Sequence, residues 1–364
     1  MIACATSEQV FITKATYLSA NQSFSILSNS VPLNALNAIY GSRLMGLSSI
    51  RFAIIASALT GVIGMSHVQA GPSVTPLVDS QWLQTHLNDD EVVIVDVRSG
   101  IDGTDAAGFA NGHITNAVYS SYTGAGWRVA ADGVPGKVPA IGDLESLIGS
   151  LGVSNDDTVV VVPAGVGSTD FGSAALVYWT FKYLGHDDVA ILNGGYQGWL
   201  DAGGEKATGQ SNPVAATFTA QPRPELLADT QAVEAALDAG EQLVDARPAE
   251  QYSGKAKHPA ALNAGTIPGA ASLEERLLVN QGTAQFIDRS EVEALVEVAG
   301  IETGQPIISF CNTGHWAATA WFALSEVAQL DNVSLYDGSM TEWTQDTNRP
   351  LALAQRALST LLGN

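Results

Sequence analysis

The chain has 364 residues, of which 46% are hydrophobic and 15% charged, and this composition excludes a disordered chain, a collagen-like chain and a disulfide scaffold. With 16 Lys and Arg against 37 Asp and Glu, the formal net charge of −21 disfavours nucleic acid and anionic lipid as partners. The length predicts two domains, since one domain typically spans roughly 100–200 residues.

The N-terminal region carries the pattern of a secretory signal. An uncharged apolar run at residues 52–65 follows two arginines and precedes a triplet at 68–70 with small or modest side chains at the cleavage positions. We expect residues 1–70 to be cleaved after Ala70, giving an exported, periplasmic protein without a membrane partner. A start at Met45 would make this an ordinary signal, so the true start is open. A single N-terminal membrane anchor is the alternative, although the run is short for a bilayer.

Cysteine usage singles out one residue of the mature chain. Cleavage would remove Cys4 and leave Cys311 as the only thiol, so no internal disulfide can form. A lone thiol in an oxidising compartment is a liability unless it is buried or used. Cys311 is therefore either a buried, inert residue or a functional one.

The remainder of the chain is a tandem repeat. Each half has a strand that ends in Asp-x-Arg, a second apolar strand, an apolar helix and a closing glycine turn. The matching segments are residues 96–98 and 245–247, 159–162 and 307–310, 173–184 and 317–327, and the turns at Gly194-Gly195 and Gly338. We expect these turn glycines to take positive φ.

Short apolar strands that alternate with helices predict an α/β fold, with a mostly parallel sheet flanked by helices on both faces in each half. We place the first domain at residues 75–203 and the second at 224–352. The linker at 204–223 is rich in Gly, Ser, Thr, Ala and Pro and is expected to be extended. A tail at 353–364 follows.

The candidate chemistry lies on the loop after the strand at 307–310. Cys311 directly follows that strand, and a helix is expected to begin near Ala317. Backbone N–H groups of such a loop and the helix N-terminus would stabilise a thiolate, lower the pKa of the thiol and favour nucleophilic attack. The loop residues are Asn312, Thr313, Gly314, His315 and Trp316.

The doubled pattern, the Asp-x-Arg strand ends and the cysteine loop resemble the two-domain rhodaneses, or sulfurtransferases, over about residues 75–350. The resemblance implies two rhodanese-like domains and an enzyme without a cofactor. It implies that Cys311 accepts a sulfane sulfur as a persulfide, held by the loop amides. The donor would be a small anion, thiosulfate or 3-mercaptopyruvate, and the acceptor cyanide or a thiol. The first domain would be inactive, because Pro163 stands at the position that matches Cys311.

The sequence departs from this family in its basic residues. Thr313 stands where the family often has Lys or Ser, and Gln251 where an Arg usually contacts the anionic substrate. Lys255, Lys257 and His258 follow and are candidates for the missing charge, with a solvated surface as the alternative. The choice between thiosulfate and 3-mercaptopyruvate therefore stays open.

Four further residues are candidates for either a functional or a structural role. His315 is a candidate to orient substrate, donate a proton or hold positive charge, against a role in shaping the loop. Trp316 lines the pocket or packs in the core. Asp245 and Arg247 are expected to be a structural pair. The single Cys left after cleavage and the six His of the full sequence show no ligand spacing, which predicts no metal site.

Two other functions remain to be weighed. A non-enzymatic persulfide carrier or partner-binding module would also fit the loss of basic residues. A phosphatase or arsenate reductase uses a similar loop but needs Arg six residues after the cysteine, where this chain has Ala317. The resemblance places the active site at the domain boundary, and the oligomeric state stays unknown.

Overall fold

The computed structural model describes residues 74–353 and 362–363. The expected signal region at 1–70, with its cleavage site at Ala70 and the alternative start at Met45, lies outside the described residues, as does most of the tail at 353–364. Among the residues that are described, no helix is long and apolar enough to cross a membrane.

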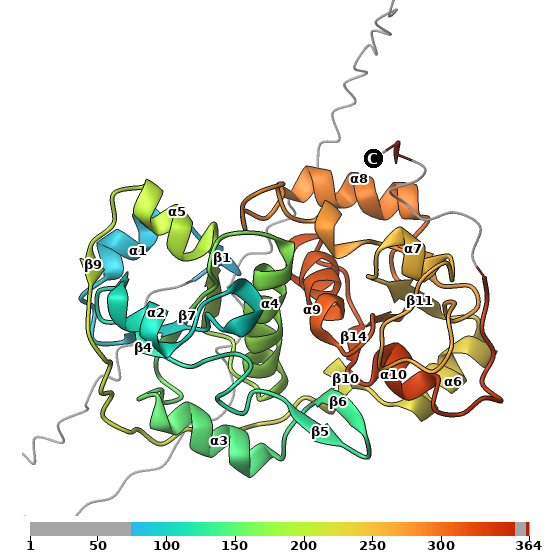
Figure 1. Cartoon of the computed structure of the whole chain (residues 1–364), viewed down its shortest axis with the longest axis horizontal. Coiled ribbons are helices and arrows are strands. Elements are labelled where there is room, and N and C mark those ends of the chain that lie inside the picture. Colours follow the sequence, from blue (N-terminus) through green and yellow to red (C-terminus); the bar gives the residue numbers. More distant parts are fainter. Residues whose placement is uncertain (1–73, 354–361, 364) are drawn as a thin grey trace, which may run out of the picture. The chain divides into compact units, whose positions relative to one another are not determined.

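The first half of the described chain alternates short strands and helices (Figure 1). Its elements are β1 (Leu77–Val78), α1 (Ser80–His86), β2 (Val92–Asp96), η1 (Gly100–Asp102), α2 (Ala106–Asn111), β3 (His113–Ile114), β4 (Val118–Tyr119), β5 (Val129–Ala131), β6 (Val134–Lys137), α3 (Ile141–Ser150), β7 (Thr158–Val162), α4 (Ser168–Tyr183), β8 (Val189–Leu192), α5 (Gly195–Asp201) and β9 (Lys206–Ala207).

The second half repeats this alternation with fewer strands. Its elements are η2 (Pro224–Leu226), β10 (Leu227–Ala228), α6 (Thr230–Ala239), β11 (Gln242–Asp245), α7 (Ala249–Tyr252), β12 (Ala271–Ser272), η3 (Glu275–Leu277), α8 (Arg289–Ala299), β13 (Ile307–Phe310), α9 (His315–Trp321), η4 (Phe322–Val327), β14 (Val333–Tyr336) and α10 (Ser339–Trp343). The segment η4 is a turn of π-helix.

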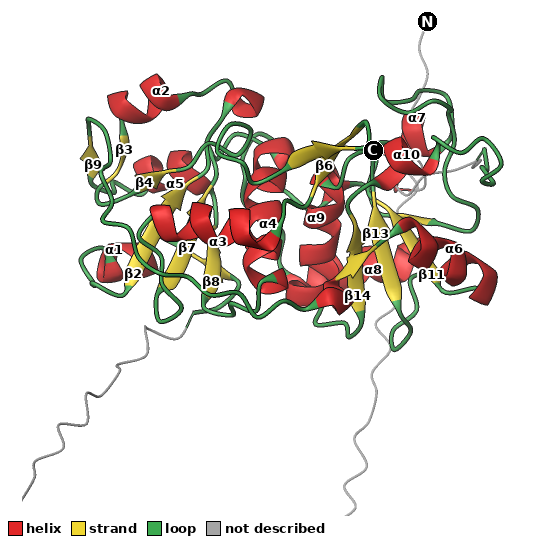
Figure 2. Cartoon of the chain, turned by 90° about the horizontal axis from the view of Figure 1, so that it is seen from below, coloured by secondary structure: helices red, strands yellow, loops and turns green. Residues whose placement is uncertain are grey.

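The two halves have the same sheet. The first orders its strands β1-β8-β7-β2-β4 and the second β10-β14-β13-β11-β12, and every pairing in both is parallel (Figure 2). Because each sheet is flanked by helices, the predicted fold of two similar α/β domains is confirmed. The carboxyl ends of parallel strands meet at one edge, where Asp96 and Asp245 end equivalent strands.

Alternation along the strands distributes side chains between two helix layers. In β7, Val159 and Val161 face the core that contains α3 and α4, whereas Val160 and Val162 face the core that contains α1, α2 and α5. In the second half, α8 and α9 cover one face, and α6 and α10 cover the other. Both faces of each sheet are therefore buried, which explains the continuous apolar strands.

One hydrophobic core runs through both halves. Helix α4 packs against α9, and the core that contains them draws residues from both sheets. Phe171 of the first half contacts Phe286 and Phe322 of the second, with ring centroids 4.8 and 5.7 Å apart. An apolar interface of this kind holds the halves together as one packed body.

The segment expected as a linker is extended and follows the surface of the first half. Strand β9 pairs antiparallel with β3, and the N–H of Ala216 donates to the carbonyl of Gly149 at 2.9 Å. Phe218 is buried there. The segment is therefore anchored by hydrogen bonds and by apolar packing.

The closing turns differ between the halves. Gly194 and Gly195 take φ of 85° and 57°, as predicted. The prediction for Gly338 is wrong: its φ is −68°, and the next residue, Ser339, takes the left-handed conformation at φ 48°. Gly338 is instead crowded, since a Cβ there would lie 1.7 Å from Oε2 of Glu342.

Candidate active site

Cys311 lies in the loop between β13 and α9, at the carboxyl end of the second sheet, and is 1% exposed. Burial raises the pKa of its thiol, opposed by the backbone N–H groups of Thr313, Ala317, Trp316 and Asn312, which favour the thiolate. The expected lowering of the pKa is wrong, because desolvation of the charged form outweighs these amides. The resting group is a neutral thiol within reach of four amides.

Ser339 fixes the shape of this loop. Its Oγ accepts hydrogen bonds from the N–H of Cys311 at 2.9 Å and of Gly314 at 3.2 Å, and donates to the carbonyl of Tyr336 at 2.8 Å. One hydroxyl therefore ties the start and end of the loop to the turn before α10. The N–H of Met340 also donates to the carbonyl of Cys311.

Gly314 is required by a close approach. Its φ is +82°, and a Cβ would lie 3.1 Å from backbone atoms of Asp337. A larger residue would push the loop away from the β14–α10 turn and change the direction of the amides that follow.

The first half contacts this loop through His315. The Nε2 of His315 lies 2.8 Å from the carbonyl of Thr169, and Nδ1 lies 3.0 Å from the hydroxyl of Tyr122. A carbonyl only accepts, so Nε2 carries the proton and Nδ1 accepts from the Tyr122 O–H. Burial lowers the pKa of His315 to about 4, so the ring is neutral near pH 7 and holds no positive charge beside the thiol.

A hairpin of the first half also reaches the loop. Asp132 and Gly133 both take positive φ in the turn between β5 and β6, and the hairpin extends to α10 (Figure 1). A Cβ on Gly136 would lie 2.3 Å from the carbonyl oxygen of Thr313, so the two backbones touch. The active-site loop is thereby bounded by the first half.

Lys137 anchors this hairpin to the second half. Its Nζ lies 2.5 Å from Oδ1 of Asp337 and 3.0 Å from Oε2 of Glu342. Although burial opposes the charge, these two carboxylates raise the pKa of Lys137. The N–H of Val138 donates to the other Asp337 oxygen at 3.0 Å.

Of the four expected substrate-binding residues, Gln251 forms a hydrogen bond with the loop. Gln251 accepts a hydrogen bond from Nδ2 of Asn312 at 2.8 Å. Lys257 donates instead to the carbonyl of Ala261, and Nδ1 of His258 accepts from the N–H of Ala260. Lys255 is exposed.

Asp245 and Arg247 form a buried pair within the second half. Their closest atoms are 2.6 Å apart, and Arg247 also donates to the carbonyl of Gly265. Asp96 and Arg98 pair in the same way in the first half. Trp316 is partly buried, and its Nε1 has no hydrogen-bond partner.

The matching loop of the first half, at residues 163–167, holds a carboxylate. Asp170 is 2% exposed and accepts from the N–H groups of Gly165 at 2.6 Å, Val166 at 3.2 Å and Gly167 at 2.6 Å. Pro163 supplies neither a thiol nor an N–H. This amide cluster is therefore filled by the domain's own anion.

Sequence reasoning missed the residues that the first half contributes, namely Tyr122, Lys137 and the hairpin. The Asp132-Gly133 pair between valines is a signal for a hairpin. No sequence pattern places Tyr122 beside His315, because that contact depends on how the halves pack.

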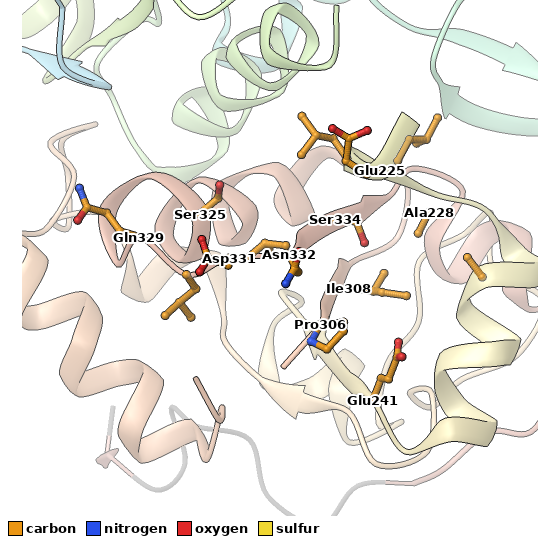
Figure 3. A pocket seen from close by; sticks show the side chains of 15 residues that line it. Glu225, Ala228, Glu241, Pro306, Ile308, Ser325, Gln329, Asp331, Asn332 and Ser334 are labelled. Atoms are coloured by element: carbon orange, nitrogen blue, oxygen red, sulfur yellow. The ribbon is translucent and has the colours of Figure 1, made fainter. Parts of the chain in front are cut away.

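A cavity of about 720 Å³ lies at the opposite end of the second sheet (Figure 3). Pro306, which precedes β13, and Asn332, which precedes β14, line it, together with carboxylates of Glu225, Glu241 and Asp331. Its lining has no Lys or Arg, so it does not suit an anionic substrate. Among the described residues, no cluster of His, Cys, Asp and Glu is arranged to hold a metal ion.

Comparison with known proteins links this geometry to one family. Residues 79–202 and 229–346 each match the model of the rhodanese-like domain. A Haloferax volcanii protein named "Putative thiosulfate sulfurtransferase" is 32% identical over 283 residues, covering 76% of this chain and 95% of that protein.

Two further proteins are similar along most of their length. The "Sulfur carrier protein TtuD" of Thermus thermophilus is 31% identical, covering 76% of this chain and 96% of that protein. The crystal structure of SseA from Escherichia coli, described as a 3-mercaptopyruvate sulfotransferase, superimposes with a TM-score of 0.65 at 28% identity. The match covers 73% of this chain and 99% of SseA.

Proposed function

This chain belongs to the rhodanese family of sulfurtransferases, and we propose that it moves a sulfane sulfur through a persulfide on Cys311. The donor is a small anion, thiosulfate or 3-mercaptopyruvate, and the acceptor is cyanide or a thiol. The observation that carries the proposal is the buried Cys311 thiol in the loop between β13 and α9, whose shape is fixed by the Ser339 hydroxyl.

With thiosulfate, the thiolate of Cys311 attacks the outer sulfur. A bond forms between Sγ and that sulfur, the sulfur–sulfur bond of the donor breaks, and its electron pair leaves with sulfite. The charges balance, since a thiolate and a thiosulfate dianion give a persulfide anion and a sulfite dianion. Cyanide then attacks the outer sulfur of the persulfide, which releases thiocyanate and restores the thiolate.

The raised pKa of Cys311 has a role in this sequence. A neutral thiol does not repel an approaching anion, whereas a resting thiolate would. With thiosulfate, the proton of Cys311 leaves to solvent. With 3-mercaptopyruvate, the thiolate attacks the donor's sulfur, the carbon–sulfur bond breaks with its electron pair on carbon, and the proton of Cys311 ends on the methyl group of pyruvate. The donor's own S–H proton then leaves the persulfide to solvent. The amides of Asn312, Thr313, Trp316 and Ala317 then stabilise the anionic sulfur in a site that excludes water.

His315 serves as a positioning residue in this scheme. With Nε2 donating to Thr169 and Nδ1 accepting from Tyr122, its ring holds the start of α9 against the first half. The amides of Trp316 and Ala317 follow directly, so their direction depends on this contact.

A persulfide carrier is the second candidate. The loop at residues 311–316 contains no Lys or Arg, and one similar protein is named a sulfur carrier. A carrier would form the persulfide but turn over slowly without a protein partner. The phosphatase alternative is disfavoured, because Ala317 is buried and offers only its N–H to the sulfur.

We also propose that the protein acts after export to the periplasm. The apolar run at residues 52–65 and the triplet before Ala70 support this. The N-terminus of protein purified from a periplasmic fraction tests it: a chain that begins at Gly71 supports export, and an intact N-terminus contradicts it.

Steady-state thiocyanate formation tests the enzyme. Wild type is assayed with cyanide and either thiosulfate or 3-mercaptopyruvate, with Cys311→Ser as the matched control. Turnover by wild type alone supports the proposal and identifies the preferred donor. A cyanide-labile persulfide without turnover favours the carrier, and equal turnover by both proteins would overturn the role of Cys311.

A further inference from the structure

Arg128 of the first half is a partly buried arginine whose Nε has no hydrogen-bond partner. Its Nη1 donates to the carbonyl of Trp127, and its Nη2 donates to the carbonyl of Leu176 at 3.1 Å and to Oγ1 of Thr180 at 2.9 Å. Its Nε is buried and has no hydrogen-bond partner. These bonds orient the group along α4 and leave at least one N–H for a ligand.

The charge of Arg128 also lacks a partner. Within the described part of the chain, no carboxylate lies within 4.0 Å of it. Asp337 acts on it from further away, but Asp337 is already bound by Lys137 and by the N–H of Val138. Burial lowers the pKa of Arg128 to about 10, so it stays charged at neutral pH.

An unpaired buried charge is costly unless an anion compensates it. Stacking on an aromatic face compensates only in part, and the guanidinium carbon of Arg128 lies 5.5 Å from the ring centroid of Trp179. The arrangement is that of a site prepared for an anion.

The backbone of Arg128 lies next to the cysteine loop. Val129, which follows Arg128, pairs with Lys137 across the hairpin, and Gly136 beside Lys137 touches the carbonyl oxygen of Thr313. Tyr122 and His315 are in direct contact. Arg128 further precedes β5, the first strand of the hairpin that touches Thr313.

The residues of the second half that were expected to bind the donor offer no buried free cation. Gln251 is uncharged and bonded to Asn312, Lys257 donates to Ala261, Lys255 is exposed, and His315 is neutral. We propose that Arg128 of the first half binds the anionic end of the sulfur donor used by Cys311 of the second half. The inference rests on the proposed function and assigns a specificity role to the half without a nucleophile.

The test compares donors of different charge on the same protein. Thiosulfate and methyl methanethiosulfonate both present a sulfur–sulfur bond to Sγ, but the second is neutral and releases methanesulfinate. Arg128→Met is expected to slow persulfide formation from thiosulfate by about tenfold to a hundredfold, the effect of losing a charged hydrogen bond. Reaction with the neutral reagent should change by less than about threefold.

Three controls accompany this variant. Arg128→Lys keeps the charge and should recover part of the thiosulfate rate. Arg289→Met removes a half-exposed arginine of α8 that pairs with Glu293 and should change neither rate. The ratio of the two rates within one sample is independent of the folded fraction. An equal fall with both reagents, or no fall with thiosulfate, would overturn the proposal.

Binding without transfer separates this inference from the proposed function. Titration calorimetry of thiosulfate into Cys311→Ser, with and without Arg128→Met, reports anion binding alone. At least tenfold weaker binding by the double variant supports Arg128 even if wild type forms no persulfide, and equal affinity contradicts it.

Discussion

The loop at residues 163–167 and the loop that begins at Cys311 occupy equivalent places in two equivalent sheets, yet hold different groups. In the first half, three amides converge on the carboxylate of Asp170. In the second half, the loop holds the buried thiol of Cys311, whose thiolate its amides favour. An amide-rich turn before a helix suits an anion in both, and the chemistry depends on what fills it.

Each of the two loops is approached by a residue of the other half. Tyr122 donates its N–H to the carbonyl of Val97, and Glu275 does the same to Ala246, so they occupy matching positions. Tyr122 reaches the cysteine loop of the other half, and Glu275 lies 3.4 Å from Oγ of Ser168 beside the Asp170 loop. Each half therefore helps to build the loop site of its partner.

The largest expected effect concerns the position of the thiol. Pro163→Cys in a Cys311→Ser background should leave turnover about 10⁴-fold or more below wild type, because Asp170 occupies the amides. Thiocyanate formation measures this. A rate of thiocyanate formation within tenfold of wild type would show that any thiol at this edge suffices and that the difference between the two loops does not decide activity.

Removal of the internal anion should destabilise the first half. Asp170→Ala leaves the N–H groups of Gly165, Val166 and Gly167 without this acceptor and should cost about 3 kcal/mol in the free energy of unfolding. Urea denaturation measures the change. The control is Asp143→Ala, an exposed carboxylate in the first turn of α3, with an expected effect within about 0.5 kcal/mol. Similar losses in the two variants would contradict the role of Asp170.

Glu275 should make stability depend on pH. Burial raises its pKa to about 7, from an unfolded value near 4.5, so the folded state holds an extra proton between these values. This stabilisation is present below pH 4.5 and is lost as the pH rises through 7, by up to about 3 kcal/mol. His315 has the opposite sign, since its stabilisation is lost as the pH falls from 6.5 to 4.

The difference between wild type and Glu275→Gln isolates this contribution. Wild type should lose stability relative to the variant from pH 5 to pH 8, measured by denaturation at each pH. The exposed Glu293→Gln serves as the control. If the free energy of unfolding depends on pH in the same way in wild type and Glu275→Gln, the Glu275 carboxyl does not contribute to the pH dependence of stability.

The smallest expected effect is at Ser339. Ser339→Ala removes the acceptor shared by the N–H groups of Cys311 and Gly314 and should slow persulfide formation about tenfold. Stopped-flow measurement with excess thiosulfate reports the rate. An unchanged rate would mean that the loop keeps its shape without this hydroxyl.

Local patterns were enough to predict the repeat, the parallel sheets and the loop that carries Cys311. They failed where one competing effect outweighed another. The loop sequence predicted the amides that lower the pKa of Cys311. Burial of the thiol outweighs them and raises the pKa, and this burial depends on the other half. The positive φ lies at Ser339 rather than at Gly338, in the turn where the Ser339 hydroxyl accepts from the N–H groups of Cys311 and Gly314.

The contributions of the first half could not be predicted. Tyr122 and Arg128 carry no motif. The contact of Tyr122 with His315 exists only once α4 packs against α9, and Arg128 is held by α4 of its own half. Asp170 had a weak signal, since it is the third residue of a helix that follows a glycine-rich loop.

Intact-mass spectrometry reports directly whether Cys311 carries a persulfide. Wild type and Cys311→Ser are incubated with thiosulfate and, separately, with 3-mercaptopyruvate, and then treated with cyanide. We predict that wild type alone gains the mass of one sulfur atom and that cyanide removes it. No gain with either donor, or the same gain on Cys311→Ser, would contradict a persulfide on Cys311.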